Sequence, residues 1–369
     1  MKNDRFEFRK KKLEVTGRKF MRKIRKSLRF QFVWNLIRFL RMKEFYAMSG
    51  DSFWDNVRQT RSPRASAPFW FQRLLMFLLR LDFEVCSSDE YSFPFYCLTP
   101  PQWDRKRTVL YLHGGGNVNE ATKTHWFFLI RTAVRARARI VMPQYPLAPE
   151  YSCADALEMI REVYEKILET TSSDHVFLMG DSAGGGLTLS SAMLFRDLGL
   201  PGPRCLVMIS PALEFGVSDS EFQPEIPNIE KLDPMLSFGS FSTILEKWRG
   251  PFSPGDWHAE PLFGDLEGLP PMTIFIGTSD ILSLGARAFL KKVSKLNEEK
   301  EKRSREGLKN EQAPKRLILL EYREFPEMFH CWPLIPLPES REARNEIWEI
   351  IQSDREEPGK RQKMEESFF

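Results

Sequence analysis

The chain has 369 residues, 42% of them hydrophobic, so it can bury a large core and is not an intrinsically disordered protein. Its five cysteines are odd in number and contain no C-x-x-C pair, which argues against a zinc site and a disulfide framework and favours a reduced, cytoplasmic protein. The net charge is only +4, but that charge is unevenly distributed.

The positive charge is concentrated at the beginning of the chain. Residues 1–45 hold sixteen Lys or Arg against four Asp or Glu, a net charge of +12. Such an arm can make peripheral contact with an anionic membrane, and a solvated tail before a cap helix is the alternative. No recognisable nucleic-acid module accompanies the charge, so we expect no nucleic-acid partner.

Two apolar segments follow within the first 85 residues. In residues 31–46 the polar side chains fall on one face of a helix whose other sides carry Phe, Trp, Leu and Ile. Residues 69–81 are more apolar still, but their longest unbroken apolar run, 74–79, is far shorter than the roughly twenty residues of a membrane span. We therefore assign residues 1–85 to a basic arm and cap helices.

The first strands of a core are predicted at residues 91–99 and 107–112. The second of them ends in His113 and three glycines, which suits a loop whose backbone N–H groups face a ligand. The loop fits neither of the glycine-rich motifs that bind phosphate.

A third strand at 139–142 and a helix at 154–168 lead to the strand 176–179, which runs directly into Gly-Asp-Ser-Ala-Gly-Gly at 180–185. A strand, G-x-S-x-G and then a helix make up a nucleophile elbow, with Ser182 on the sharp turn. With that serine downstream, the glycine loop is interpreted as an oxyanion hole, its donors being the N–H groups of Gly115, Gly116 and Ala183.

Further strands are predicted at 205–209, 272–276 and 317–322, followed by a helix at 339–351. Strands that alternate with helices indicate a mostly parallel sheet, an α/β fold. Between 213 and 260 this periodicity is lost, apart from a short helix near 241–248. We assign 86–212 and 261–369 to the core and 213–260 to a cap insertion.

A serine hydroxyl needs a base, and the base needs an orienting carboxylate. Of the five histidines only His258 and His330 follow Ser182, and His330 comes after a strand whereas His258 lies among loop residues. Asp280 follows another strand, in the expected order of Ser, acid and His. The sequence therefore predicts a catalytic triad of Ser182, Asp280 and His330.

These motifs resemble the hormone-sensitive-lipase-like family of α/β-hydrolases, in its bacterial carboxylesterase branch. The matching pieces occur in order within residues 88–350, at 113–116, 145–150, 180–185, 261–271, 280–282 and His330. The resemblance implies an α/β-hydrolase fold with a helical cap, the triad and oxyanion donors already named, and a structural role for His113. The chain departs from the family at Ile281, at Cys331 and in a charged segment at 297–314.

We therefore expect a serine carboxylesterase that hydrolyses short- to medium-chain acyl esters through an acyl-enzyme, with no metal and no organic cofactor. A membrane-associated lipase is the first alternative, because of the basic arm. A non-catalytic receptor for a small ligand is the second, since plant hormone receptors share this fold but lack the catalytic histidine; the presence of His330 argues against it.

Overall fold

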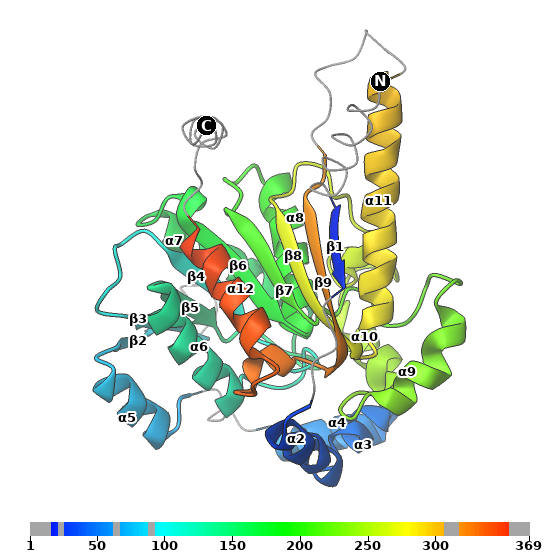
Figure 1. Cartoon of the computed structure of the whole chain (residues 1–369), viewed down its shortest axis with the longest axis horizontal. Coiled ribbons are helices and arrows are strands. Elements are labelled where there is room, and N and C mark those ends of the chain that lie inside the picture. Colours follow the sequence, from blue (N-terminus) through cyan, green and yellow to red (C-terminus); the bar gives the residue numbers. More distant parts are fainter. Residues whose placement is uncertain (1–15, 21–25, 62–66, 88–92, 306–316, 354–369) are drawn as a thin grey trace, which may run out of the picture.

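The computed structural model describes residues 16–20, 26–61, 67–87, 93–305 and 317–353. Within them the chain forms one nine-stranded sheet in the order β1-β9-β8-β7-β6-β4-β5-β3-β2 (Figure 1). All neighbouring strands from β1 to β5 in this order are parallel, and β3 is antiparallel to both β5 and β2. The strands are β1 (Thr16–Phe20), β2 (Asp82–Ser87), β3 (Pro94–Thr99), β4 (Thr108–Leu112), β5 (Arg139–Pro143), β6 (Val176–Asp181), β7 (Cys205–Ile209), β8 (Met272–Ser279) and β9 (Leu320–Phe329).

Helices cover both faces of this sheet, so its central strands are buried runs without polar alternation, as in other parallel sheets. One face packs against α7 (Cys153–Leu168), α8 (Ala183–Asp197) and α11 (Ser283–Arg305). The other face packs against α6 (Lys123–Ala136) and α12 (Arg341–Gln352) (Figure 1). These layers confirm the predicted α/β-hydrolase fold.

The remaining helices gather mostly at the end of the sheet where the parallel strands finish (Figure 1). None of the described helices has both the length and the apolar composition needed to cross a bilayer. The longer helices are α2 (Leu28–Phe39), α3 (Met42–Ala47), α4 (Gly50–Thr60), α5 (Trp70–Leu78), α9 (Ile226–Leu232) and α10 (Phe241–Trp248). The short 3₁₀ helices are η1 (Ser173–His175), η2 (Gln223–Glu225), η3 (Phe238–Ser240), η4 (Pro261–Phe263) and η5 (Trp332–Leu334).

The N-terminal helices and the 213–260 segment pack against each other over this end of the sheet. Gly239 of η3 lies so close to the backbone of Ala47 that a Cβ there would clash. The Gly50 N–H donates to Thr243 Oγ1 at 3.0 Å, and Lys43 Nζ donates to the backbone oxygen of Asp233 at 3.1 Å. The two segments that the sequence analysis assigns to a cap are thus in direct contact.

The sheet extends into the N-terminal region more than expected. β1 lies within residues 1–85, which the sequence analysis assigns to the arm and the cap helices, and β2 begins there at Asp82 and ends at Ser87. Both are short edge strands, and β2 is largely exposed, so no apolar run marks it in the sequence. The rest of the basic arm, residues 1–15 and 21–25, lies outside the described residues.

Candidate active site

Three residues that are far apart in sequence meet because each follows directly on a strand. β6 ends at Asp181, β8 at Ser279 and β9 at Phe329, so Ser182, Asp280 and His330 come next in each case. Since these strands are parallel, their carboxyl ends lie at one edge of the sheet, where open α/β sheets bind ligands.

The side chains of the three residues form a continuous hydrogen-bonded chain. His330 Nε2 lies 2.9 Å from Ser182 Oγ, and His330 Nδ1 lies 3.0 Å from Asp280 Oδ2. A carboxylate only accepts, so Nδ1 carries the proton and Nε2 is left to accept the proton of the serine hydroxyl. Asp280 and His330 are buried, while Ser182 is partly exposed at the surface of the site. The structure thus brings together all three residues of the predicted triad.

The turn that carries Ser182 is sharp and strained. Its backbone has φ 54° and ψ −122°, a combination that costs a non-glycine residue on the order of 1–3 kcal/mol. A Cβ on Gly180 would clash with the backbone of Gly184, and one on Gly184 would clash with the backbone of Leu112. Glycine is therefore required at both flanking positions if the elbow is to fit between β4 and α8.

The glycine loop after β4 lies beside this elbow and presents free donors. Gly115 and Gly116 have φ 134° and 65°, conformations that favour glycine. Among the described residues, their N–H groups and that of Ala183 at the start of α8 donate to no protein acceptor. The first N–H groups of a helix have no partner within it and favour a nearby negative charge. The three predicted donors are thus free to bind an anionic oxygen.

The buried carboxylate of Asp181 holds this loop in place. Asp181 Oδ1 accepts from Tyr111 Oη at 2.6 Å and from the Gly114 N–H at 2.9 Å, and Oδ2 lies 3.2 Å from His125 Nε2. Burial alone raises the pKa of Asp181, but the charge of His125 and these hydrogen bonds outweigh it and lower the pKa to about 2. Asp181 therefore stays ionised, and it joins the glycine loop to the elbow.

His113 is not placed to act as a base. It is fully buried, its ring stacks on Tyr145 with centroids 4.5 Å apart, and Nδ1 lies 2.8 Å from the Gly114 carbonyl oxygen. Burial, together with the charge of His125, lowers the pKa of His113 to about 4, so its ring is neutral near pH 7. This agrees with the structural role that the family resemblance implies.

The electrostatics of His330 reflect two opposed effects. Burial alone lowers its pKa, but the charge of Asp280 and the hydrogen bond to it outweigh burial, so the net pKa of His330 is raised above its ordinary value of 6.5. A smaller contribution in the same direction comes from the charge of Asp233. An imidazolium formed at Nε2 is thus stabilised by the carboxylates behind it.

Asp233 is a residue of the site that the sequence analysis missed. It follows α9 in the 213–260 segment, is 1% exposed, and its Oδ2 accepts the N–H of Ile281 at 2.9 Å. Burial, and next to it the charge of Asp280, raise the pKa of Asp233 to about 6. The cap segment thereby holds the loop that carries Asp280. No motif marks this aspartate, because the contact joins residues 48 positions apart.

Strand β9 carries an irregularity that brings His330 to the site. The pairing of Gly277 with Phe325 is followed by that of Ser279 with Phe329, so β9 has extra residues at this point. Glu327 lies within this bulge with φ 61°. The sequence analysis predicts a strand that ends at residue 322, whereas the strand continues through Pro326 to Phe329. The bulge allows β9 to remain paired with β8 as far as Phe329.

Cys331 and Tyr46 complete the surroundings of the site. Cys331 has φ 52°, and its Sγ lies 3.4 Å from His330 Nε2 and 3.6 Å from Asp181 Oδ2. Burial and the charges of Asp181 and Asp280 raise the pKa of the Cys331 thiol well above its usual range, so it stays protonated. Tyr46 of α3 lies over the glycine loop, near Gly116. This contact between distant segments has no signal in the sequence.

Three neighbouring side chains on β2 and β3 are of the kinds that bind metals, but their surroundings do not fit a metal ion. Glu84, Cys86 and Cys97 place their donor atoms within 4.8 Å of one another on β2 and β3. Arg139 lies beside them, 3.6 Å from Glu84 Oε2, and supplies a positive charge there. Burial raises the pKa of Cys97 to about 12, which disfavours the thiolate that a metal would need.

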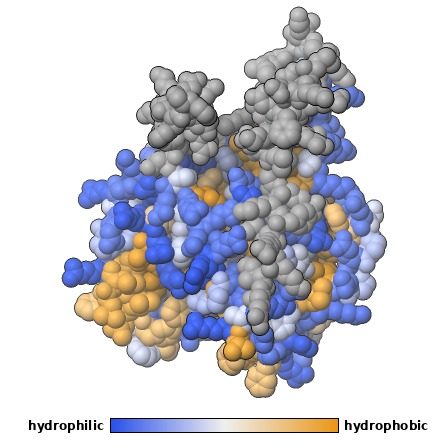
Figure 2. Space-filling view, in the orientation of Figure 1, coloured by the Kyte–Doolittle hydropathy of each residue, from blue (hydrophilic) through white to orange (hydrophobic). Residues whose placement is uncertain are grey.

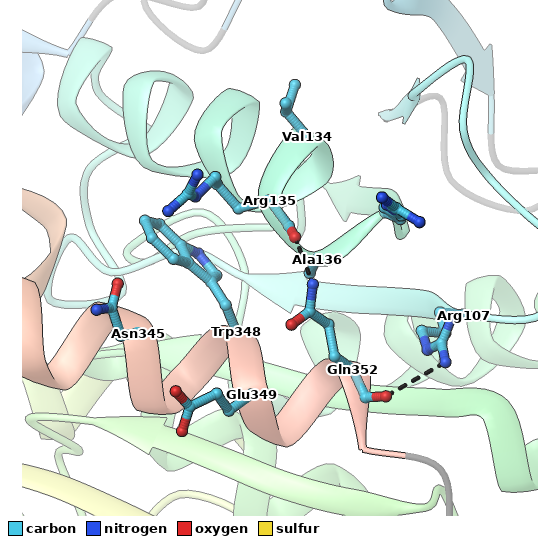
Figure 3. A pocket seen from close by; sticks show the side chains of 9 residues that line it. Arg107, Val134, Arg135, Ala136, Asn345, Trp348, Glu349 and Gln352 are labelled. Carbon is cyan, nitrogen blue, oxygen red and sulfur yellow. Dashed lines mark hydrogen bonds between the residues drawn. The ribbon is translucent and has the colours of Figure 1, made fainter.

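A cavity of about 630 Å³ lies at the other end of the sheet and is not the active site. It is bordered by the ends of α6 and α12 and by Arg107, which precedes β4, so it opens at the amino ends of the parallel strands (Figure 3). Gln352 joins the two sides of the cavity. Its side-chain amide donates to the backbone oxygen of Arg135, and its backbone oxygen accepts from the Arg107 guanidinium. Among the described residues that line it, no nucleophile lies beside a base.

Comparisons with known proteins identify the family of this chain. A family model described as alpha/beta hydrolase fold matches residues 109–309. The chain belongs to this family. It is 29% identical over 242 residues to an acetyl-hydrolase of Streptomyces hygroscopicus, covering 64% of this chain and 72% of that protein. It is 25% identical over 247 residues to an esterase of Acinetobacter venetianus, covering 66% of this chain and 74% of that protein.

A solved structure indicates the branch of the α/β-hydrolases to which this chain is similar. An esterase from the bacterial hormone-sensitive lipase family superposes with a TM-score of 0.67 and 25% identity, covering 89% of this chain and 99% of the other. The expected hormone-sensitive-lipase-like membership is confirmed.

Proposed function

We propose that this α/β-hydrolase is a serine carboxylesterase that uses Ser182 as nucleophile, His330 as base and Asp280 as orienting acid. The coarser assignment, a carboxylic ester hydrolase, follows from its esterase and acetyl-hydrolase relatives. The serine mechanism is supported chiefly by one observation, the hydrogen-bonded chain from Ser182 Oγ through the imidazole to Asp280.

In the proposed first step, Ser182 Oγ attacks the ester carbonyl carbon while its proton passes to His330 Nε2. The carbonyl oxygen becomes an anion and accepts hydrogen bonds from the N–H groups of Gly115, Gly116 and Ala183. Each such donor typically lowers the barrier by about 2.7–4 kcal/mol. When the tetrahedral intermediate collapses, the alcohol leaves with the proton from His330 and the acyl group stays on Ser182.

In the second step water replaces the alcohol. His330 Nε2 takes a proton from the water as it attacks the acyl-enzyme, and the same three N–H groups again stabilise the oxyanion. Collapse then releases the acid, and Ser182 regains its proton. Both steps need only groups of this chain and water, so no metal or organic cofactor is part of the proposal.

For the substrate, we propose esters with short to medium acyl chains. The name of the Streptomyces relative supports the short end of this range. The cap supports a limit on chain length, because Tyr46 of α3 lies against the glycine loop at Gly116 and so takes up space beside the proposed oxyanion hole.

The proposal is tested by the release of p-nitrophenol from a series of esters, from acetate to decanoate. We expect kcat/KM to be highest among the shorter chains and to fall toward decanoate, and Ser182→Ala to remove turnover of every ester. A wild-type protein that turns over none of them, but binds small ligands equally well with or without Ser182, would instead be a receptor on this fold.

A further inference from the structure

The large hydrophobic side chains that the protein exposes are concentrated on two N-terminal helices. Of seventeen such residues in the described chain, twelve lie between Leu28 and Leu79, on or next to α2 and α5. On α2, Phe32 is 68% and Phe39 80% exposed, and on α5 Phe77 is 77% exposed. Apolar patches of this kind mark interaction sites, whereas scattered apolar residues do not.

This exposure does not arise from loose packing, because the inner face of each helix is anchored. On α2, Phe30 is buried and its ring centroid lies 5.5 Å from that of Phe329, the residue before His330. Ser27 caps the same helix and bonds to Glu339. On α5, Gln72 is buried and donates to the Lys123 carbonyl oxygen at 2.8 Å. Both helices are held in place with an apolar outer face.

The charges on these helices all have one sign. Neither α2 nor α5 contains an Asp or Glu. Their exposed charged residues are Arg29, Arg38 and Arg73. Arg41 and Arg80 follow the two helices, Arg41 paired with Glu44 and Arg80 two residues before the exposed Asp82. A cavity of about 510 Å³ beside α2 is lined by Arg38, Arg41, Lys43 and Lys231 against Glu44 and Asp233. Exposed apolar and aromatic side chains beside arginines are typical of helices that lie in a membrane interface.

Both helices lie toward the end of the molecule that carries the active site. α2 lies at the lower edge of the view and α5 at its lower left (Figure 1). The space-filling view has apolar colour at both places, separated by hydrophilic residues (Figure 2). One flat surface could therefore contact both helices on the side where the parallel strands end.

We propose that the outer faces of α2 and α5 dock the protein on the surface of an anionic lipid bilayer, with its active-site end toward the membrane. The helices lie in the interface, with their apolar side chains among the acyl chains and their arginines at the lipid headgroups. A second copy of the chain fits these faces less well. A symmetric pair would bring arginines together, and neither helix offers an acidic partner.

Co-sedimentation of the full chain with phosphatidylcholine vesicles, with and without phosphatidylglycerol, tests this proposal. We expect wild type to bind only the phosphatidylglycerol vesicles, more weakly as salt rises. The double variants Phe32→Ser/Phe39→Ser on α2 and Phe77→Ser/Leu78→Ser on α5 should each lower the partition coefficient about tenfold or more. Ser182→Ala should bind like wild type, so docking is measured independently of turnover.

Matched control substitutions are available elsewhere on the surface. Leu198 and Phe263 are 53% and 44% exposed and lie outside both helices, so Leu198→Ser/Phe263→Ser should bind vesicles like wild type. Trp70 of α5 is 67% exposed, so its fluorescence reports whether the unaltered helix enters the lipid. Brominated lipids should quench the wild-type fluorescence, and less so that of Trp70→Leu.

Three results would overturn the proposal. The first is wild-type protein that stays in the supernatant with anionic vesicles. The second is binding that both double variants retain in full but that deletion of residues 1–25 abolishes, because the basic arm alone would then account for it. The third is a wild-type dimer that the double variants convert to a monomer, which would mean that a second copy covers these faces.

Discussion

Two regions that meet at the carboxyl end of β9 show how differently this chain treats polar and apolar groups. Just after the strand, His330 is 5% exposed and each of its ring nitrogens has a partner within the chain. Next to it, the outer face of α2 leaves large apolar side chains exposed, while the inner face packs on Phe329. The first region is complete within one polypeptide, whereas the second has an anchored inner face and an exposed apolar outer face that the proposed docking would cover. Substitutions should therefore affect chemistry in the first region and docking in the second.

After loss of the nucleophile itself, the largest effect is expected from His330→Ala. Loss of the base should lower kcat/KM by roughly 10⁴-fold or more, with the fold intact. His258→Gln is the matched control, since His258 also follows Ser182 but stacks between Phe252 and Trp257 and bonds to Asp256. Steady-state hydrolysis of p-nitrophenyl acetate measures both. If both variants lost kcat/KM equally, His330 would have no special role in the reaction.

Asp280→Asn should lower kcat/KM on the order of 10³-fold, because the amide no longer holds the imidazole in the required tautomer. Wild-type kcat/KM should fall as pH drops through the raised pKa of His330, since only the neutral ring accepts a proton. In Asp280→Asn this acidic limb should move to lower pH. A pH profile that keeps the wild-type limb would contradict the role of Asp280.

Asp233→Asn tests whether the cap segment acts on the triad. We expect about a tenfold loss in kcat, because the loop carrying Asp280 loses its carboxylate acceptor at the Ile281 N–H. The acidic limb should also shift to lower pH, since the charge of Asp233 raises the pKa of His330. The pH–rate profile separates this effect from a loss of stability alone, which would leave the limb in place.

Asp181 should make stability depend on pH. Its pKa in the folded state, about 2, is below its ordinary value of 3.8, so its contribution is complete above pH 4 and is lost as pH falls toward 2. The shift corresponds to about 2 kcal/mol. Urea unfolding at several pH values should show Asp181→Asn to be less stable than wild type near neutrality, by a margin that shrinks in acid. A margin independent of pH would show that the carboxylate charge does not matter.

The smallest effect is expected at Cys331. Glycine adopts its positive φ without strain, so Cys331→Gly should keep kcat within about threefold and the free energy of unfolding within about 1 kcal/mol. Cys331→Val, with a branched Cβ, should lose about 1–3 kcal/mol instead. Thermal unfolding of the two variants measures the difference. Equal stability would show that the backbone conformation carries no strain.

The sequence was most informative where chemistry depends on local spacing. Residues 180–185 fix an elbow, and strands placed before Ser182, Asp280 and His330 were enough to predict that these residues meet. Helix α10 and strand β7 also lie where the pattern predicts them.

The parts that the sequence did not reveal depend on contacts between distant segments. Asp233 reaches Ile281 across 48 positions, and Tyr46 lies over the glycine loop from another part of the cap. β2 is an exposed edge strand without an apolar pattern, and the bulge in β9 comes from its pairing with β8. Contacts between distant segments, not local composition, decide such features.

The most direct test of the central claim is covalent labelling with a p-nitrophenyl phosphonate ester, followed by peptide mass spectrometry. We expect one adduct per chain, on Ser182, formed far more slowly in His330→Ala and absent in Ser182→Ala. An adduct on another residue, or labelling of Ser182 that is as fast without His330 as with it, would contradict the proposed mechanism.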